Sequence, residues 1–247
     1  MPAPFRSLSR RVLDRVTGRP QPAPQGPHAD VIAAVRDYTM TSPARVAALC
    51  DAVEYVQNHN LPGDFVECGV WRGGSVMAML HVLKRRGELG RDVHLFDTFE
   101  GMSAPTDLDR DPDGHTAAEL LEEEKADKAA SANWAYCSQE DVERNVASVG
   151  YPAERLHFVR GKVEDTLPDA VPETISLLRL DTDWYESTKH ELEHLFPRLV
   201  PGGVLILDDY GHWEGARRAV DEYLRDRGVR MFLQRVDYTG RLAVKQG

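Results

Sequence analysis

The sequence predicts a doubly wound α/β protein, because short aliphatic runs alternate with longer amphipathic stretches from residue 63 onward. The predicted parallel strands occupy residues 65–67, 93–97, 156–159, 175–181 and 203–209. Runs this short and apolar are typical of strands that are buried on both faces of a parallel sheet. Two further runs, 231–237 and 240–246, flank Tyr238-Thr239-Gly240 and predict an antiparallel hairpin that closes the sheet.

Helices and a linker are predicted to precede the first strand. Residues 5–19 carry an apolar face surrounded by arginines. This pattern favours a short helix that packs on the domain or on a second subunit over a transit peptide. Residues 19–27 are Pro-rich, as is typical of a linker. We therefore expect residues 1–62 to form a helical cap on a domain that spans residues 63–247.

Capping residues predict where two of the helices begin. Ser42 followed by Pro43 is typical of a helix start, and an apolar stripe of helical period follows it. Thr188 and Glu191 have the spacing of a capping box ahead of a helix predicted over residues 191–199.

An acidic insertion of about residues 103–146 separates the second and third strands. Aspartates at 109, 111 and 113 mimic the calcium loop of an EF-hand, but Pro112 interrupts the loop and Leu120 stands where a bidentate Glu is required. We expect a mobile acidic lid rather than a calcium site, since long insertions in compact domains tend to be functional. His115 is the one residue of the lid that hints at a role.

Composition narrows the class of partner. The net charge is −10 and the pI is near 5.4, so no basic surface for nucleic acid is expected. The three cysteines are far apart and form neither a disulfide framework nor a zinc pattern, which favours the reducing cytoplasm. No apolar run approaches the ~20 residues that cross a bilayer. We expect a cytoplasmic homo-oligomer with neither a nucleic-acid nor a membrane partner.

A glycine-rich turn links the first strand to a helix. Glu67 ends the strand, Gly69 opens the turn, and the turn runs through Ser75 to a helix that is predicted to begin at Val76. Glycine lets a ligand approach the backbone, and the N–H groups of a helix N-terminus attract an anionic group. The dinucleotide pattern G-x-G-x-x-G is absent. The pattern E-x-G-x-x-x-G-G-S instead resembles the first motif of class I S-adenosylmethionine methyltransferases, where this turn carries the methionine part of the cofactor.

A second cofactor signal is Asp97 at the end of the second strand. Acidic residues at this place accept hydrogen bonds from ribose hydroxyls, in NAD folds as well as in methyltransferases. Thr98 and Phe99 continue this loop, and Gly161 with Lys162 follows the third strand as a candidate loop on the adenine side.

Two neighbouring strand ends carry aspartates. Asp181 and Asp183 follow one strand, and Asp208 and Asp209 follow the next. Because the carboxyl ends of neighbouring parallel strands meet at one rim, these carboxylates converge there and repel one another unless they are protonated or bridged by a cation. Oxygen ligands favour a hard ion such as Mg²⁺. The sequence therefore predicts a metal site.

The combination of VECGVWRGGS, FDTFEGM, LRLDTDWYEST and GGVLILDDYG resembles the macrocin O-methyltransferase family over residues 38–245. Members of that family methylate deoxysugars of macrolide and aminocoumarin antibiotics. The resemblance implies a class I methyltransferase fold, a sheet of Rossmann-like topology, and S-adenosylmethionine and Mg²⁺ as cofactors. It implies that Mg²⁺ is bound by Asp181, Asp208 and Asp209.

The same resemblance implies the remaining roles. Asp183 is the expected general base. The residues expected around S-adenosylmethionine are Glu67, Gly69, Ser75, Asp97, Thr98, Phe99, Gly161 and Lys162. The segment Tyr38-Thr39-Met40 is expected to fold over the cofactor, so that residues 1–62 cap its site. The acceptor is expected to be a small-molecule glycoside or a nucleotide sugar.

The predicted chemistry is a transfer of a methyl group to a sugar hydroxyl. Two adjacent hydroxyls can chelate Mg²⁺, which lowers the pKa of the one that is methylated while Asp183 accepts its proton. His212 is a second candidate proton acceptor, with Asp181 also at the reacting centre. The alternatives are a metal-dependent methyltransferase of the catechol type and, less favoured, a metal-dependent hydrolase. The hydrolase leaves the turn from Glu67 to Ser75 unexplained. An NAD-dependent oxidoreductase lacks its glycine motif, and a non-catalytic acidic binding protein explains the lid and little else.

Overall fold

The computed structural model describes residues 25–247. The helix predicted for residues 5–19 lies outside the described residues, as does most of the Pro-rich stretch 19–27. Among the described helices, none has the length and the apolar character that a membrane span requires.

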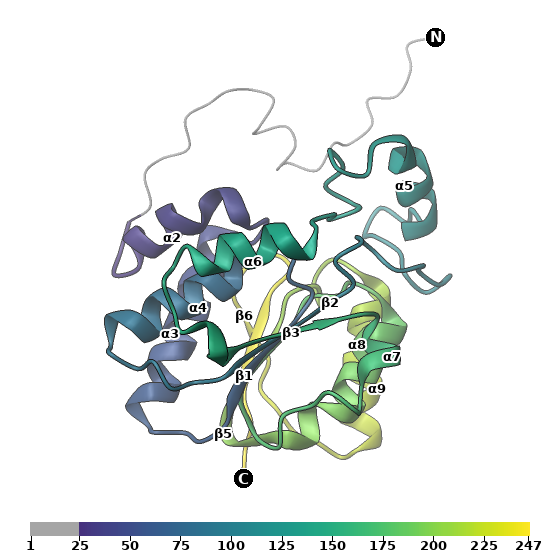
Figure 1. Ribbon diagram of the computed structural model, residues 1–247. Helices are drawn as coiled ribbons and strands as arrows, with labels where there is room; N and C mark the ends of the chain where they lie inside the picture. The colour runs from purple at the N-terminus through teal and green to yellow at the C-terminus, as the bar shows by residue number, and fades with distance from the viewer. Residues whose placement is uncertain (1–24) are drawn as a thin grey trace.

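A seven-stranded sheet in the order β3-β2-β1-β4-β5-β7-β6 forms the centre of the molecule (Figure 1). Its strands are β1 Asp64–Cys68, β2 Val93–Asp97, β3 Leu156–Arg160, β4 Ile175–Leu180, β5 Leu199–Leu207, β6 Gln234–Arg235 and β7 Arg241–Val244. Strands β1 to β5 pair in parallel, and β7 is antiparallel to both β5 and β6. The predicted doubly wound sheet and its closing hairpin are both confirmed.

Helices cover both faces of the sheet (Figure 1). One face carries α2 Ala29–Val35, α3 Pro43–Asn58, α4 Gly74–Arg85 and α6 Gln139–Ala147. The other carries α7 Val163–Thr166, α8 Tyr185–His194 and α9 Glu214–Asp226. Short 3₁₀ helices lie at Arg36–Tyr38, Lys125–Asp127, Ala153–Arg155 and Phe196–Arg198. The alternation of β1 explains the two layers, because Phe65 packs into the core under the first group and Val66 into the core under the second.

The prediction for the start of α3 is confirmed, whereas the capping box before α8 is wrong. The Ser42 hydroxyl accepts a hydrogen bond from the N–H of Arg45, and Pro43 is the first helical residue. Helix α8 begins earlier than predicted, at Tyr185, so Thr188 lies inside it. Glu191 is fully buried and accepts a hydrogen bond from the Thr182 hydroxyl at 2.9 Å. The first N–H of α8 takes its acceptor from a distant segment, and no local pattern reports that contact.

The predicted insertion divides into two parts. Its last part forms α6, which packs on α4 through the buried side chains of Val142 and Val146 and so belongs to the core. The preceding part, residues 103–138, carries α5 Ala117–Glu124 and stands away from the helical layers (Figure 1). From here on, the name lid refers to residues 103–138 only. A small apolar cluster with Trp184 and Trp213 at its centre joins the lid to the domain.

Candidate active site

The predicted aspartates meet at the rim formed by the C-terminal ends of β4 and β5. Leu180 and Leu207 are partners in the sheet, so Asp181 and Asp208 follow side by side. Asp181, Asp208 and Asp209 each offer a carboxylate oxygen, and these atoms all lie within 4.8 Å of one another. A cluster of three oxygen donors at this separation is chemically suited to Mg²⁺.

Two buried arginines form ion pairs with this cluster. Arg179, the penultimate residue of β4, donates to Asp181 and to Asp208 at 2.8 Å, and Arg45 from α3 also contacts Asp208. Arg179 pairs in addition with Glu67, its partner residue on β1, at 2.7 Å. Because both arginines are nearly inaccessible to solvent, they neutralise charge that water cannot screen.

The electrostatics of the cluster favour a cation. Burial raises the pKa of Asp181 well above its usual range, and repulsion from Asp208 and Asp209 adds to the rise. Burial also raises the pKa of Asp209, and repulsion from Asp183 and Asp208 adds to the rise. Burial also acts on Asp208, but Arg179 and Arg45 outweigh it and lower the pKa of Asp208 to about 2. The arginines thus keep Asp208 ionised, and a bound cation would offset the repulsion that raises the pKa of Asp181 and Asp209.

Asp183 adopts a strained backbone beside this cluster. Its φ of 67° lies in the left-handed region that non-glycine residues rarely adopt, and its N–H donates to Asp209 at 3.2 Å. Burial raises the pKa of Asp183 to about 7, which hydrogen bonding to Asp209 opposes. A carboxyl group with this pKa can exchange a proton near neutral pH.

The glycine-rich turn lies against the rim that carries the three aspartates. Gly69 has a φ of 81°, and a Cβ there would collide with the backbone carbonyl of Asp181. Asp97 at the end of β2 accepts hydrogen bonds from the N–H groups of Val70 at 2.6 Å and Trp71 at 3.2 Å. Burial raises the pKa of Asp97, and these backbone bonds oppose the rise. The turn, Asp97 and the N-terminus of α4 provide the acid and the N–H donors that suit a ribose and an amino-acid carboxylate.

The other residues predicted for the cofactor surround this turn. Ser75 is buried at the N-terminus of α4, and Glu67 is buried in its pair with Arg179. Burial raises the pKa of Glu67 to about 7, although Arg179 opposes the rise. On the far side of Asp97, the Phe99 N–H donates to its carboxylate at 2.7 Å. The Gly161 N–H donates to the Asp97 carbonyl at 3.0 Å.

Two further residues belong to the predicted cofactor set. Thr98 shares the Asp97 loop and donates from its hydroxyl to the Gly101 carbonyl at 2.6 Å. Lys162 caps α7 next to Gly161.

The segment of residues 38–42 lies directly over the start of α4. A Cβ at Gly74 would lie 2.5 Å from the Tyr38 carbonyl oxygen and 2.7 Å from Thr39 Cβ. One residue beyond Met40, the Thr41 hydroxyl accepts a hydrogen bond from Arg179 at 3.0 Å. The segment therefore spans from the glycine-rich turn to the arginine under the aspartates.

His212 lies outside the three-aspartate cluster. Its Nδ1 is 2.7 Å from the Tyr238 hydroxyl, and its ring contacts the edges of Trp213 and Tyr238. Its predicted role as a proton acceptor stays a prediction.

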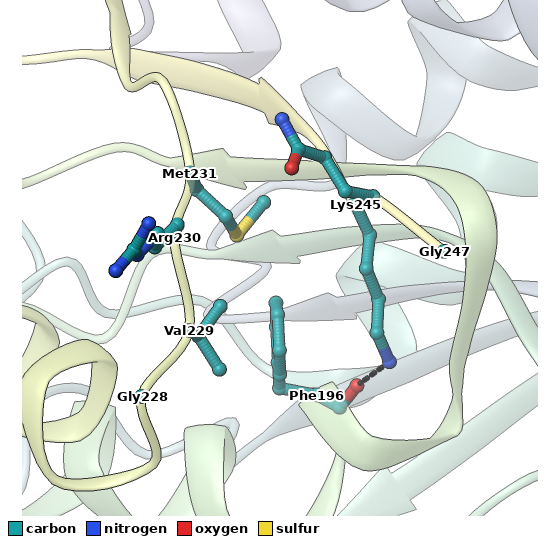
Figure 2. Close-up of a pocket in the computed structure, with 8 residues that line it drawn as sticks. Phe196, Gly228, Val229, Arg230, Met231, Lys245 and Gly247 are labelled. Atoms are coloured by element: carbon teal, nitrogen blue, oxygen red, sulfur yellow. Dashed lines mark hydrogen bonds between the residues drawn. The ribbon is translucent and has the colours of Figure 1, made fainter.

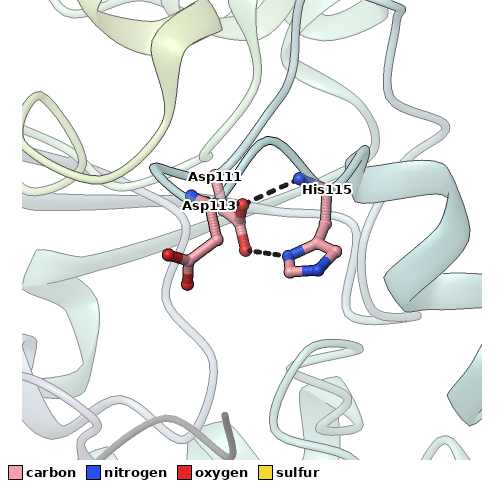
Figure 3. A group of neighbouring side chains, drawn as sticks. All are labelled: Asp111, Asp113 and His115. Carbon is pink, nitrogen blue, oxygen red and sulfur yellow. Dashed lines mark hydrogen bonds and ion pairs between the residues drawn. The ribbon is translucent and has the colours of Figure 1, made fainter. Parts of the chain in front are cut away.

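Two other features are separate from the rim. Asp111, Asp113 and His115 form a second group within the lid, with the His115 ring 3.0 Å from Asp111 (Figure 3). Asp109 does not join them, because its side chain is fully buried. A hollow of about 300 Å³ lies at the opposite end of β5, between Phe196, Met231 and Lys245 (Figure 2). It is remote from the strand ends that carry the aspartates.

Arg45, Arg179 and Asp109 are absent from the predicted site. Arg179 had a signal, since it is the one charge inside the aliphatic run of β4. Arg45 and Asp109 reach their partners only through tertiary structure, so the sequence around them carries no sign of the contacts.

The order of the sheet, its antiparallel β7, the glycine-rich turn and the acid that ends β2 define a class I S-adenosylmethionine-dependent methyltransferase. The chain matches the macrocin-O-methyltransferase (TylF) family over residues 28–244. It belongs to this family and is an O-methyltransferase.

Relatives of known activity agree with the assignment. The 8-demethyl-8-(2,3-dimethoxy-alpha-L-rhamnosyl)-tetracenomycin-C 4'-O-methyltransferase of Streptomyces olivaceus is 36% identical, over 82% of this chain and 74% of its own. Demethyldecarbamoylnovobiocin O-methyltransferase of Streptomyces niveus is 34% identical, over 75% of this chain and 67% of its own. Among solved structures, the O-methyltransferase NovP is 32% identical with a TM-score of 0.74, over 85% of this chain and 83% of that one.

Proposed function

We propose that this O-methyltransferase uses S-adenosylmethionine and Mg²⁺ to methylate a hydroxyl of a deoxysugar in antibiotic biosynthesis. The observation that carries the proposal is the cluster of Asp181, Asp208 and Asp209 beside Asp183, in a chain of this family. The relative from Streptomyces olivaceus is named for a rhamnosyl-bearing compound, and Mycinamicin III 3''-O-methyltransferase of Micromonospora griseorubida is 32% identical over 82% of this chain and 76% of its own. These names favour a glycosylated small molecule over a free nucleotide sugar as the acceptor.

The cofactor is proposed to lie along the glycine-rich turn. Asp97 would accept from the ribose hydroxyls, and the N-terminus of α4 would face the methionine carboxylate. Glu67, Gly69 and Ser75 would shape the turn beneath the cofactor. Residues 38–40, which belong to the predicted N-terminal cap of residues 1–62, would cover it. Thr98, Phe99, Gly161 and Lys162 form the adenine side. The proposal is supported by the hydrogen bonds that link the Asp97 carboxylate to Val70, Trp71 and Phe99, and the Asp97 carbonyl to Gly161.

Asp181, Asp208 and Asp209 are proposed to hold Mg²⁺, and Asp183 to accept the proton of the acceptor hydroxyl. When bound, the metal lowers the pKa of a hydroxyl and S-adenosylmethionine supplies an electrophilic methyl group. As the hydroxyl oxygen took the methyl group from the sulfonium sulfur, Asp183 would accept the proton that the hydroxyl loses. The rim also fixes the approach of the reactants, which is where much of the acceleration arises. We propose that the protein acts as a homo-oligomer.

Two asparagine variants test these roles, with EDTA treatment as the first step. EDTA is expected to abolish methyl transfer and Mg²⁺ to restore it. Asp181→Asn removes a negative ligand, so cation affinity falls and excess Mg²⁺ partly restores turnover. Asp183→Asn cannot accept the proton, so kcat falls about 10²–10⁴-fold while cation and cofactor still bind.

Calorimetry and steady-state kinetics on a panel of deoxysugar glycosides distinguish the two variants. Near-normal turnover of Asp183→Asn with a lowered melting temperature would overturn the base assignment. Full activity of metal-free protein would overturn the metal site.

A further inference from the structure

Asp109 is a fully buried lid carboxylate with no arginine, lysine or histidine partner among the described residues. All of its bonds come from neutral donors. One oxygen accepts from the N–H of Thr106 at 2.7 Å and from the Thr106 hydroxyl at 2.9 Å. The other oxygen accepts from the N–H of Tyr185 at 2.7 Å. Because Tyr185 is the first residue of α8, Asp109 supplies the cap that this helix lacks locally.

The same carboxylate also touches the start of α9. A Cβ at Gly215 would collide with the Asp109 carboxylate oxygen, so only glycine permits this approach. Beside it, the Glu214 N–H donates to the Arg110 carbonyl at 3.0 Å. The charge of Asp109 therefore lies between two helix N-termini, whose positive dipole ends stabilise an anion.

These two helices begin directly after the loops that carry the aspartates. Residues 181–184 lead from β4 into α8, and residues 208–213 lead from β5 into α9. The lid contacts these loops at their ends. The Trp184 ring N–H donates to the Ser103 carbonyl at 3.0 Å, and the Trp184 ring packs edge-on with Trp213, with 4.9 Å between the ring centroids. A strained residue such as Asp183 keeps its conformation only when its surroundings fix it.

We propose that Asp109 is a positioning residue through which the lid sets the spacing of the two aspartate loops. The inference rests on the proposed function, since it assigns Asp109 a role in the metal site of that reaction. A simple helix cap stabilises the fold and leaves cation affinity unchanged. A positioning residue changes cation affinity and kcat in protein that is fully folded.

The first test compares Asp109→Asn with Asp107→Asn, an exposed aspartate of the same lid that loses the same charge. Asn keeps the shape, but it turns an amide N–H group toward one of the N–H donors that Asp109 satisfies. Calorimetry with Mg²⁺ and with S-adenosylhomocysteine then measures the two affinities separately. For Asp109→Asn we expect about a tenfold loss of Mg²⁺ affinity and a lower kcat, with unchanged S-adenosylhomocysteine affinity. Asp107→Asn is expected to match the natural protein.

An Asp109→Asn protein with a lower melting temperature but natural Mg²⁺ affinity and kcat would overturn the inference. If the natural protein itself binds no Mg²⁺, the proposed function fails instead, so the two failures are distinguishable. Thr106→Val is a milder variant that removes only one bond to Asp109. It is expected to reduce Mg²⁺ affinity in the same direction by a smaller factor.

A double-mutant cycle supplies an independent test. Gly215→Ala pushes on the Asp109 carboxylate without altering its charge, so we expect it to weaken Mg²⁺ binding as Asp109→Asn does. In the Asp109→Ala background the collision is gone, and adding Gly215→Ala should then have little effect on Mg²⁺ affinity. Additive losses would show that the two residues act separately and would overturn the coupling.

Discussion

Arg179 forms ion pairs with three carboxylates of the candidate site. Its guanidinium contacts Glu67, Asp181 and Asp208, and its own exposed fraction is 1%. A planar group with five donors can bridge several carboxylates at once, which lysine cannot do. Arg179 therefore joins the strand that leads to the cofactor turn to the strands that carry the predicted metal ligands.

Replacing Arg179 by Met is expected to destabilise the protein by about 3–5 kcal/mol, because buried carboxylates lose their counterion. Urea unfolding at neutral pH measures this loss. The double variant with Glu67→Gln should recover part of it, since a neutral amide needs no buried cation. Arg179→Lys should fall between the natural protein and Arg179→Met. Equal stability of Arg179→Met and the double variant would show that Glu67 and Arg179 are not coupled.

The aspartates whose convergence the sequence predicted share one property. Asp181, Asp208 and Asp209 come together because their positions depend only on where strands end and which strands are neighbours. Both features follow from the aliphatic pattern. Asp109 caps Tyr185 from 76 residues away in the chain, and no periodicity reports such a contact. The misplaced start of α8 has this cause.

At the scale of elements, the site depends on a close packing of the residue 38–42 segment on the glycine-rich turn. Gly73 has a φ of 87°, which lets the turn enter α4 directly, and Gly74 leaves room for the Tyr38 carbonyl. The sequence motif predicts the glycines, but the covering segment was inferred only from family resemblance. Its contact with Arg179 brings a segment that precedes the first strand close to the aspartates.

Gly74→Ala tests this packing. The new Cβ would approach the Tyr38 carbonyl to 2.5 Å, so the covering segment must move. We expect about a tenfold loss of S-adenosylhomocysteine affinity, equivalent to ~1.4 kcal/mol. Gly90→Ala is the matched control, because nothing lies within 4 Å of a Cβ at that position. Calorimetry compares the two, and equal affinities would separate residues 38–42 from the cofactor site.

At the scale of the whole molecule, the two predicted sites share one rim. Gly69 of the cofactor turn lies against the Asp181 carbonyl, and the Asp181 N–H donates to the Cys68 carbonyl at 2.9 Å. The lid reaches the rim from the side of α8 and α9, whereas residues 38–42 reach it from the side of α3 and α4. Parts of the chain that lie far apart in sequence thus meet at this rim.

The choice of cofactor is testable at this scale by thermal unfolding, because a ligand that binds only the folded protein raises its stability. At a concentration 100 times its Kd, S-adenosylhomocysteine should stabilise the fold by about 2.7 kcal/mol. For a domain of this size that corresponds to a rise in Tm of about 5–10 °C. NAD should give no rise, because the turn lacks the glycine pattern that approaches a pyrophosphate. In Asp97→Asn the response to S-adenosylhomocysteine should shrink, since the ribose loses a charged acceptor. A larger rise with NAD than with S-adenosylhomocysteine would contradict the proposed cofactor site along the Gly69–Ser75 turn.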